Sequence, residues 1–145
     1  MDTRWINYYL VLVLHMATKQ KKTKKEGQKE RCINFLVSPY PISIYVCSTN
    51  YNISRRVHID VDLAEPDPAS IAETLVGRNK NGSYAVVIRI PDKYEEEIVW
   101  HEAIHGAAHL LDHLGINLIA ESMDALIYPT EFIVRKIKRD FYKLK

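Results

Sequence analysis

The apolar positions of this chain form short β-type runs in its middle and one long helical pattern after them. Residues 41–47 (PISIYVC) are rich in β-branched and aromatic residues, and residues 83–90 (SYAVVIRI) follow an NKNG turn, so both segments are predicted to be strands. Asp67-Pro68, then residues 69–76 and Gly77, carry the start and stop signals of a short helix.

A longer helix is predicted from residue 93 to 114, because Asp92 and Glu95 have capping-box spacing and Gly115 follows its end. Its expected core face has apolar residues at helical spacing: Trp100, Ala103, Ile104, Ala107, Leu111 and Leu114. A second helix is predicted from residue 120 to 142, interrupted at Pro129. The expected fold class is therefore α+β, a small β-sheet packed on the first helix with a second long C-terminal helix.

The N-terminal segment does not fit this pattern. Trp5–Ala17 is an apolar run of thirteen residues, whereas a membrane span needs about twenty. A basic cluster, Lys19–Lys25, follows the run, while a secretory signal carries its positive charge in front. We predict that residues 1–31 are a poorly ordered extension and that residues 32–145 form the domain. The alternative is a membrane-surface anchor that combines the apolar run with the lysines.

Composition and charge narrow the function classes. The chain has 145 residues, of which 47% are hydrophobic and 26% charged, as in one globular domain. Residues 1–31 hold eight Lys/Arg against three Asp/Glu, and residues 32–145 hold twelve against fifteen. Because the predicted domain is mildly acidic, we expect no nucleic-acid partner. The basic run at 135–145 is interpreted as the solvated face of an amphipathic helix, with phosphate or lipid contact as the alternative.

The two cysteines, Cys32 and Cys47, have no CxxC spacing. This count excludes a disulfide-rich scaffold and a zinc site made of cysteines alone. We therefore expect reduced, partly buried thiols and a cytoplasmic location.

The residues with a chemical signature are His101, Glu102 and His105, an HExxH motif within the longer predicted helix. Residues four apart on a helix lie about 40° apart around its axis and about 6 Å along it. Two imidazoles in this arrangement can bind one Zn²⁺, and Glu102 can act on a zinc-bound water. The motif thus predicts a zinc site with Glu102 as general base.

The third zinc ligand is expected from the following helix. His109 lies about 12 Å along the helix axis from His101, too far for both to reach one ion, and His113 lies farther still. An antiparallel return after Gly115 would bring Glu121 and Asp124 beside the motif. Glu121 is the predicted ligand, with Asp124 as the alternative ligand or as a partner that fixes a histidine tautomer. Both acids can also belong to a solvated first turn.

Residues 99–137 (VWHEAIHGAAHLLDHLGI, then AESMDALIYPTEFIVRKI) resemble small HExxH metallopeptidase-like proteins of bacteriophages. They are more distantly similar to ImmA/IrrE-type peptidase domains. The resemblance implies a minimal zincin fold, with His101 and His105 as zinc ligands, Glu102 as the catalytic acid, and Glu121 or Asp124 as the distal acid.

The predicted function is that of a zinc-dependent metallopeptidase, which hydrolyses peptide bonds of a peptide or protein substrate through a zinc-bound water. If the strand at 83–90 is an edge strand, its backbone can pair with an extended substrate. The alternative is a zincin-fold binding module whose zinc is structural or catalytically silent.

Overall fold

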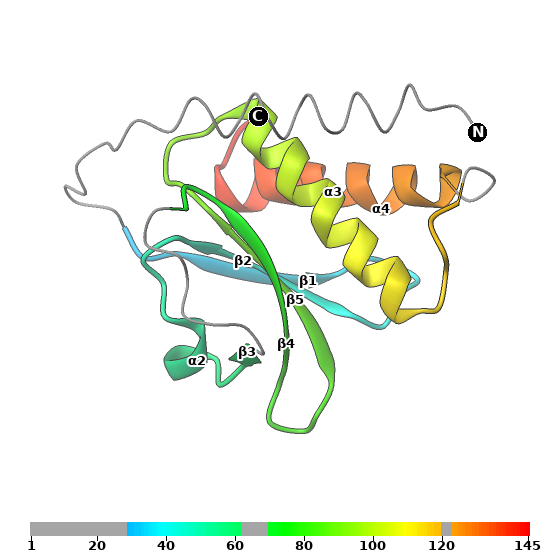
Figure 1. Ribbon diagram of the computed structural model, residues 1–145. Helices are drawn as coiled ribbons and strands as arrows, with labels where there is room; N and C mark the ends of the chain where they lie inside the picture. Colours follow the sequence, from blue (N-terminus) through cyan, green and yellow to red (C-terminus); the bar gives the residue numbers. More distant parts are fainter. Residues whose placement is uncertain (1–28, 62–69, 120–122) are drawn as a thin grey trace.

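The computed structural model describes residues 29–61, 70–119 and 123–145, which form a mixed β-sheet with helices on both faces (Figure 1). The sheet order is β1-β2-β5-β4-β3. Its strands are β1 (Cys32–Leu36), β2 (Ser43–Ser48), β3 (Asp60–Val61), β4 (Glu73–Arg78) and β5 (Tyr84–Ile90). Strands β2 and β5 are parallel, and the other neighbouring strands are antiparallel.

Two longer helices cover one face of the sheet, and a short helix lies on the other. The longer ones are α3 (Glu96–His113) and α4 (Asp124–Lys136), and α4 continues into the π-helical turn η2 (Ile137–Phe141). The short helix α2 (Ile53–Arg56) packs through Ile53 on the opposite face. The predicted α+β class, with a small sheet and two main helices, is confirmed.

Strand β5 is the centre of the sheet because both of its faces are buried. Val86, Ile88 and Ile90 point to the side of α3 and α4, while Ala85 and Val87 point to the side of α2. A strand buried on both faces has a nearly continuous apolar sequence, as this one does. The segment is therefore a strand as predicted, but it is not an edge strand, because β2 and β4 flank it.

Helix α3 packs closely across β5 at Gly106. A Cβ atom at this position would lie 3.0 Å from Cδ1 of Ile88, so only glycine allows this approach without displacing the isoleucine. Of the predicted core face, Ala103, Ala107 and Leu111 are buried, Trp100 and Ile104 are half-buried, and Leu114 is 37% exposed. The buried face of α3 is therefore rotated about the helix axis relative to the predicted core face, because it is centred on the contact with β5.

Three local predictions are wrong, and at residues 73–78 and at Asp92 the chain contacts distant segments instead. Residues 73–78 form strand β4 instead of a helix, paired along their whole length with β5, and residues 62–69 lie outside the described part. Glu95 caps α3 without a side-chain bond, because the Asp92 carboxylate accepts from Lys29 N–H and Arg31. Pro129 lies buried inside α4 without ending it.

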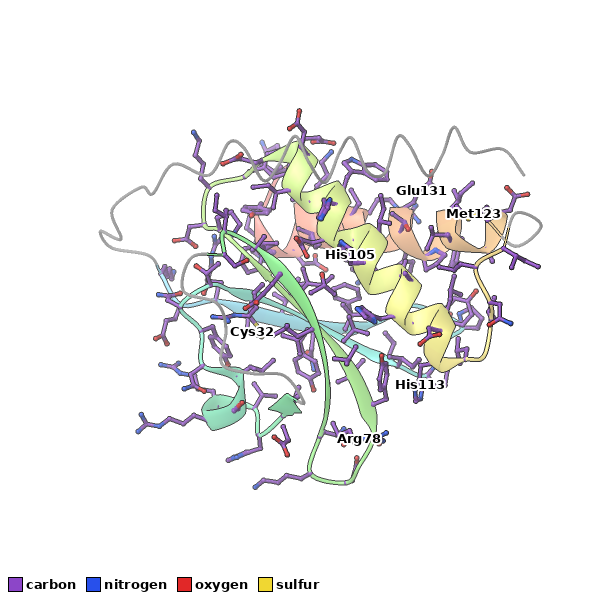
Figure 2. The ribbon with its side chains drawn as sticks, in the orientation of Figure 1. Cys32, Arg78, His105, His113, Met123 and Glu131 are labelled. Carbon is purple, nitrogen blue, oxygen red and sulfur yellow. A yellow bond between two sulfur atoms is a disulfide. The ribbon has the colours of Figure 1, made fainter. Side chains whose placement is uncertain are left out.

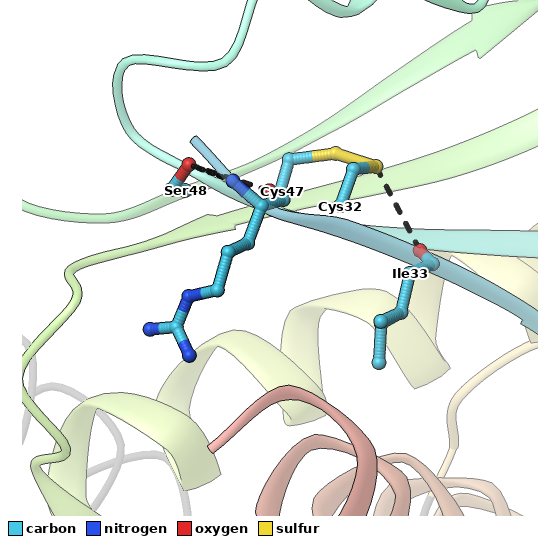
Figure 3. The surroundings of a disulfide bond; sticks show 5 residues. Cys32, Ile33, Cys47 and Ser48 are labelled. Atoms are coloured by element: carbon cyan, nitrogen blue, oxygen red, sulfur yellow. Dashed lines mark hydrogen bonds between the residues drawn. A yellow bond between two sulfur atoms is a disulfide. The ribbon is translucent and has the colours of Figure 1, made fainter. Parts of the chain in front are cut away.

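Cys32 and Cys47 form a disulfide, so the prediction of reduced thiols is wrong (Figure 3). Strand β1 pairs with β2 in a register that sets these two residues directly opposite each other, with their Cα atoms 4.1 Å apart. The sequence spacing gave no sign of this pairing, because β1 was not predicted as a strand.

Arg31 ties the start of the described chain to two other segments. Its guanidinium donates to the Phe141 carbonyl at 2.8 Å and to Asp92 Oδ1 at 2.9 Å, and it lies 4.4 Å from the centre of the Phe141 ring. The chain therefore enters the domain beside the turn that leads from β5 into α3.

None of the helices in the described ranges is long and apolar enough to span a membrane. The predicted extension 1–31 and its alternative as a membrane anchor fall on residues 1–28 almost entirely, outside the described part.

Because Leu110 is fully buried where α3 meets the core, Leu110→Ala is expected to lower the free energy of unfolding by about 2–5 kcal/mol. The same substitution at an exposed leucine, Leu144→Ala, is expected to cost about 1 kcal/mol or less because Leu144 is already partly solvated. Chemical denaturation of both variants measures the difference. Equal losses would contradict the described orientation of α3.

Candidate metal and catalytic site

His101 and His105 meet on one side of α3, one helical turn apart, and Figure 2 shows His105 midway along that helix. Their Nε2 atoms are 3.1 Å apart, and their ring centres are 4.7 Å apart. Two nitrogens that bind zinc tetrahedrally at about 2.0–2.1 Å lie about 3.3 Å from each other. The two nitrogens lie at hydrogen-bond distance from each other, and this separation is also close to that of two ligands on one zinc ion, so the zinc site stays a prediction.

Both imidazoles are half-buried, and this affects their protonation. Desolvation lowers the pKa of His101, and desolvation together with the neighbouring charges of His101 and His109 lowers the pKa of His105. Both rings therefore favour the neutral form, which is the form that binds metal ions.

The Glu102 side chain does not lie on the side of α3 where the two histidines meet. It points toward the sheet, and only 5% of the residue is exposed. Thr74 on β4 donates its hydroxyl to Glu102 Oε2 at 2.6 Å and lies 3.2 Å from the Glu102 backbone oxygen. The side chain of the predicted general base is therefore held between α3 and β4.

Burial raises the pKa of Glu102 from 4.5 to about 7. The hydrogen bond from Thr74 opposes this rise, and the negative charge of Glu73 adds to it. A carboxyl group in this range can exchange a proton near neutral pH, as a general acid–base group must.

The third ligand is the part of the prediction that the described residues do not supply. Asp124, the alternative ligand, is exposed at the first position of α4. Within residues 29–61, 70–119 and 123–145, no His, Cys, Asp or Glu completes a group of three that could hold a metal ion. Glu121, the predicted ligand, lies outside these ranges, so the prediction for it stays open.

The other two histidines of α3 do not complete a metal-binding group with the pair among the described residues. Figure 2 shows His113 at the C-terminal end of the helix, where its ring stacks on Tyr84 with centres 3.9 Å apart. His109 belongs to no group of three metal-ligating side chains among the described residues.

The strand next to the site is β4, and much of its outer edge lacks a described partner. Strand β3 pairs only with Gly77 and Arg78, at the far end of β4. Over residues 73–76, no strand of the described ranges pairs with the side of β4 that faces away from β5. This stretch includes Thr74, which contacts Glu102, while residues 62–69, which follow β3 directly, lie outside the described part.

The sequence analysis did not identify Thr74, or the ion pair of Glu73 with Arg89, as residues near the site. Glu73 Oε1 lies 2.7 Å from Arg89 Nη1, and Arg89 also donates to the Thr49 carbonyl. All three residues depend on the pairing of β4 with β5, which the predicted helix at 69–76 concealed. The TLV sequence at 74–76 was the available signal for a strand.

No known protein family, curated protein or solved structure matches this chain. The resemblance to bacteriophage metallopeptidase-like proteins and to ImmA/IrrE-type domains therefore stays a hypothesis.

The raised pKa of Glu102 predicts a pH dependence of stability for the metal-free protein. The folded protein holds this proton more tightly than the unfolded chain, so this group lowers the free energy of unfolding as pH rises from 4.5 to about 7. The loss is at most about 3 kcal/mol. Glu102→Gln removes it, so the variant is expected to be more stable than wild type at pH 8.

Urea denaturation of the metal-free proteins at pH 5 and pH 8 measures this difference. The lowered pKa values of His101 and His105 act with the opposite sign, but they are common to both proteins and cancel in the comparison. Glu131→Gln, at an exposed site on α4, is the matched control and is expected to leave the profile unchanged. An identical pH profile for Glu102→Gln and wild type would show that Glu102 is solvated.

Proposed function

We propose that this protein is a zinc-dependent metallopeptidase. The observation that carries the proposal is the 3.1 Å separation of the two Nε2 atoms of His101 and His105. Neutral imidazoles and a carboxylate are ordinary zinc ligands, and two helical histidines leave room for a third ligand and for solvent. The two histidines therefore suit zinc, and the described residues supply no third ligand beside them.

In this proposal His101 and His105 hold the ion, and a carboxylate from the segment before α4 completes the ligand set. Glu121 is the proposed third ligand, and Asp124 is the alternative. A zinc ion held there would polarise the carbonyl group of a bound peptide and make water more acidic.

Glu102 is the proposed general base, which takes a proton from the attacking water and returns it to the leaving amine. Thr74 donates its hydroxyl to Oε2 of this carboxyl group, so the other carboxyl oxygen, Oε1, is the one proposed to take the proton. The burial of Glu102 supports this role, since a raised pKa suits a group that both accepts and donates a proton.

The proposed substrate is an extended peptide or protein segment that pairs with residues 73–76 of β4, which have no partner on the side away from β5 among the described residues. An unpaired strand edge offers backbone donors and acceptors to an added strand, which gives affinity without a deep pocket. Residues 73–76 take the place that the sequence analysis gave to the strand at 83–90, because that strand lies inside the sheet.

A second candidate is a zincin-fold interaction module with a silent zinc site. The observation that favours it is the bond between Glu102 and Thr74, which occupies one carboxyl oxygen. If this bond persists when substrate is bound, Glu102 has less freedom to act on water, and the module would bind peptides without cleaving them.

The cytoplasmic location is also a proposal, and the disulfide argues against it. That inference assumed reduced thiols, whereas disulfides such as Cys32–Cys47 are more typical of oxidising compartments. Thiol labelling of the protein in its native cells tests the location.

Purified protein is expected to bind one zinc ion per chain, and His101→Ala or His105→Ala is expected to lose it. His113→Ala is the matched control on the same helix and is expected to keep it. Metal analysis after dialysis measures the content. Full zinc content in both His101→Ala and His105→Ala would refute the site.

The same metal analysis decides whether Glu121 or Asp124 is the third ligand. Glu121→Gln is expected to weaken zinc binding strongly, whereas Asp124→Asn is expected to change it little, because Asp124 is exposed. The reverse result would make Asp124 the ligand.

Glu102→Gln is expected to keep its zinc and to lose hydrolysis of fluorescently labelled casein, because an amide cannot take the proton from water. Glu131→Gln is the control and is expected to retain wild-type activity. Undiminished hydrolysis by Glu102→Gln would reject Glu102 as the base. A zinc-loaded wild type that binds casein without cleaving it would favour the interaction module instead.

A further inference from the structure

Large apolar side chains are concentrated on the surface around the connection between α3 and α4. Among the described residues, six of the eight exposed large hydrophobic residues lie between positions 114 and 128: Leu114, Leu118, Ile119, Met123, Ile127 and Tyr128. We call these six residues the apolar patch. Exposed apolar side chains that are concentrated on one part of the chain can mark a surface that another segment or partner covers.

The patch continues across more than one element. Met123 and Ile127 are one helical turn apart at the start of α4, so they share one face of the helix. Tyr128 donates its hydroxyl to the Ser38 carbonyl at 2.7 Å, which brings the β1–β2 connection, and with it the exposed Leu36, close to the patch.

The hydrophobic core does not bury the side chains of the patch. Ile119 and Ile127 are 57% and 54% exposed, whereas Ile133 and Ile137 on the same C-terminal segment are completely buried. Leaving such side chains in water forgoes the burial free energy that their neighbours in the core gain. Covering the patch would therefore stabilise the folded protein.

We propose that the apolar run Trp5–Ala17 of the same chain covers this patch. The run has the matching chemistry, because it is rich in Leu, Val and aromatic residues and its sequence also needs an apolar environment. It lies among residues 1–28, which the structure does not describe. This inference concerns a surface outside the proposed zinc site and does not depend on the proposed function.

The chain is long enough for this contact. The described part begins at Lys29, whose N–H donates to Asp92 at 3.0 Å, close to the start of α3. The patch begins at the other end of α3, and a helix of 18 residues is about 27 Å long. The eleven residues 18–28 reach about 36 Å when extended, so they can span the length of the helix.

Charge also favours this arrangement. The basic cluster Lys19–Lys25 follows the apolar run directly, and the exposed carboxylates Asp112 and Asp124 flank the connection between the two helices. Opposite charges around an apolar contact guide its orientation. A short tether also gives the run an effective concentration in the millimolar range, which favours its own chain over a second copy.

Trp5 makes the proposal testable by fluorescence, because the chain has only one other tryptophan, Trp100. In the full-length Trp100→Phe protein, Trp5 is expected to emit at shorter wavelength than in a synthetic peptide of residues 1–28. Ile127→Gln and Ile119→Gln in this background are each expected to shift the emission back toward that of the peptide. Leu144→Gln, at an exposed leucine outside the patch, is the matched control and is expected to leave the emission unchanged.

The proposal is overturned if Trp5 emits as the free peptide does, or if the patch variants and Leu144→Gln give the same spectrum as their parent. Dilution shows whether the patch is covered by the same chain or by a second copy. If the contact is intramolecular, the emission of Trp5 does not change with protein concentration. A red shift on dilution, with dimers in sedimentation equilibrium, would assign the patch to a second copy. A blue shift that requires added anionic lipid vesicles would assign the run to a membrane surface.

Discussion

The close packing of α3 across β5 and beside β4 is the constraint on which the candidate site depends. Gly106 allows the helix to approach Ile88, and the buried residues Ala103, Ala107 and Leu110 hold it there. This packing fixes the rotation of α3 about its own axis. His101 and His105 therefore meet on a half-buried side, and Glu102 faces Thr74 on β4.

The same packing creates the electrostatic character of the site. It removes most of the water around Glu102 and part of the water around both imidazoles, so the pKa values of both imidazoles are lowered and the pKa of Glu102 is raised to about 7. A cation near Glu102 would lower the pKa of its carboxyl group, because the cation stabilises the negative charge. A single helix–sheet contact thus couples the stability of the fold to the chemistry of the motif.

The sequence predicted those parts of the structure that depend on local periodicity. The strand at 83–90, helix α3 and the meeting of His101 with His105 follow from spacing alone, since helical geometry brings residues four apart together. Strands β1 and β4, the Cys32–Cys47 disulfide and the contact from Thr74 depend on pairing between distant segments, which no local pattern encodes. For the same reason the sequence did not show that the strand at 83–90 lies inside the sheet.

The central claim is that His101 and His105 bind one zinc ion together. A crystal structure of the zinc-loaded protein, with the ion located by its anomalous scattering, tests this claim most directly. The account predicts one ion at about 2.0–2.1 Å from Nε2 of both histidines, with a carboxylate as a further ligand. A zinc ion bound elsewhere, or the two rings turned apart with no ion between them, would contradict it.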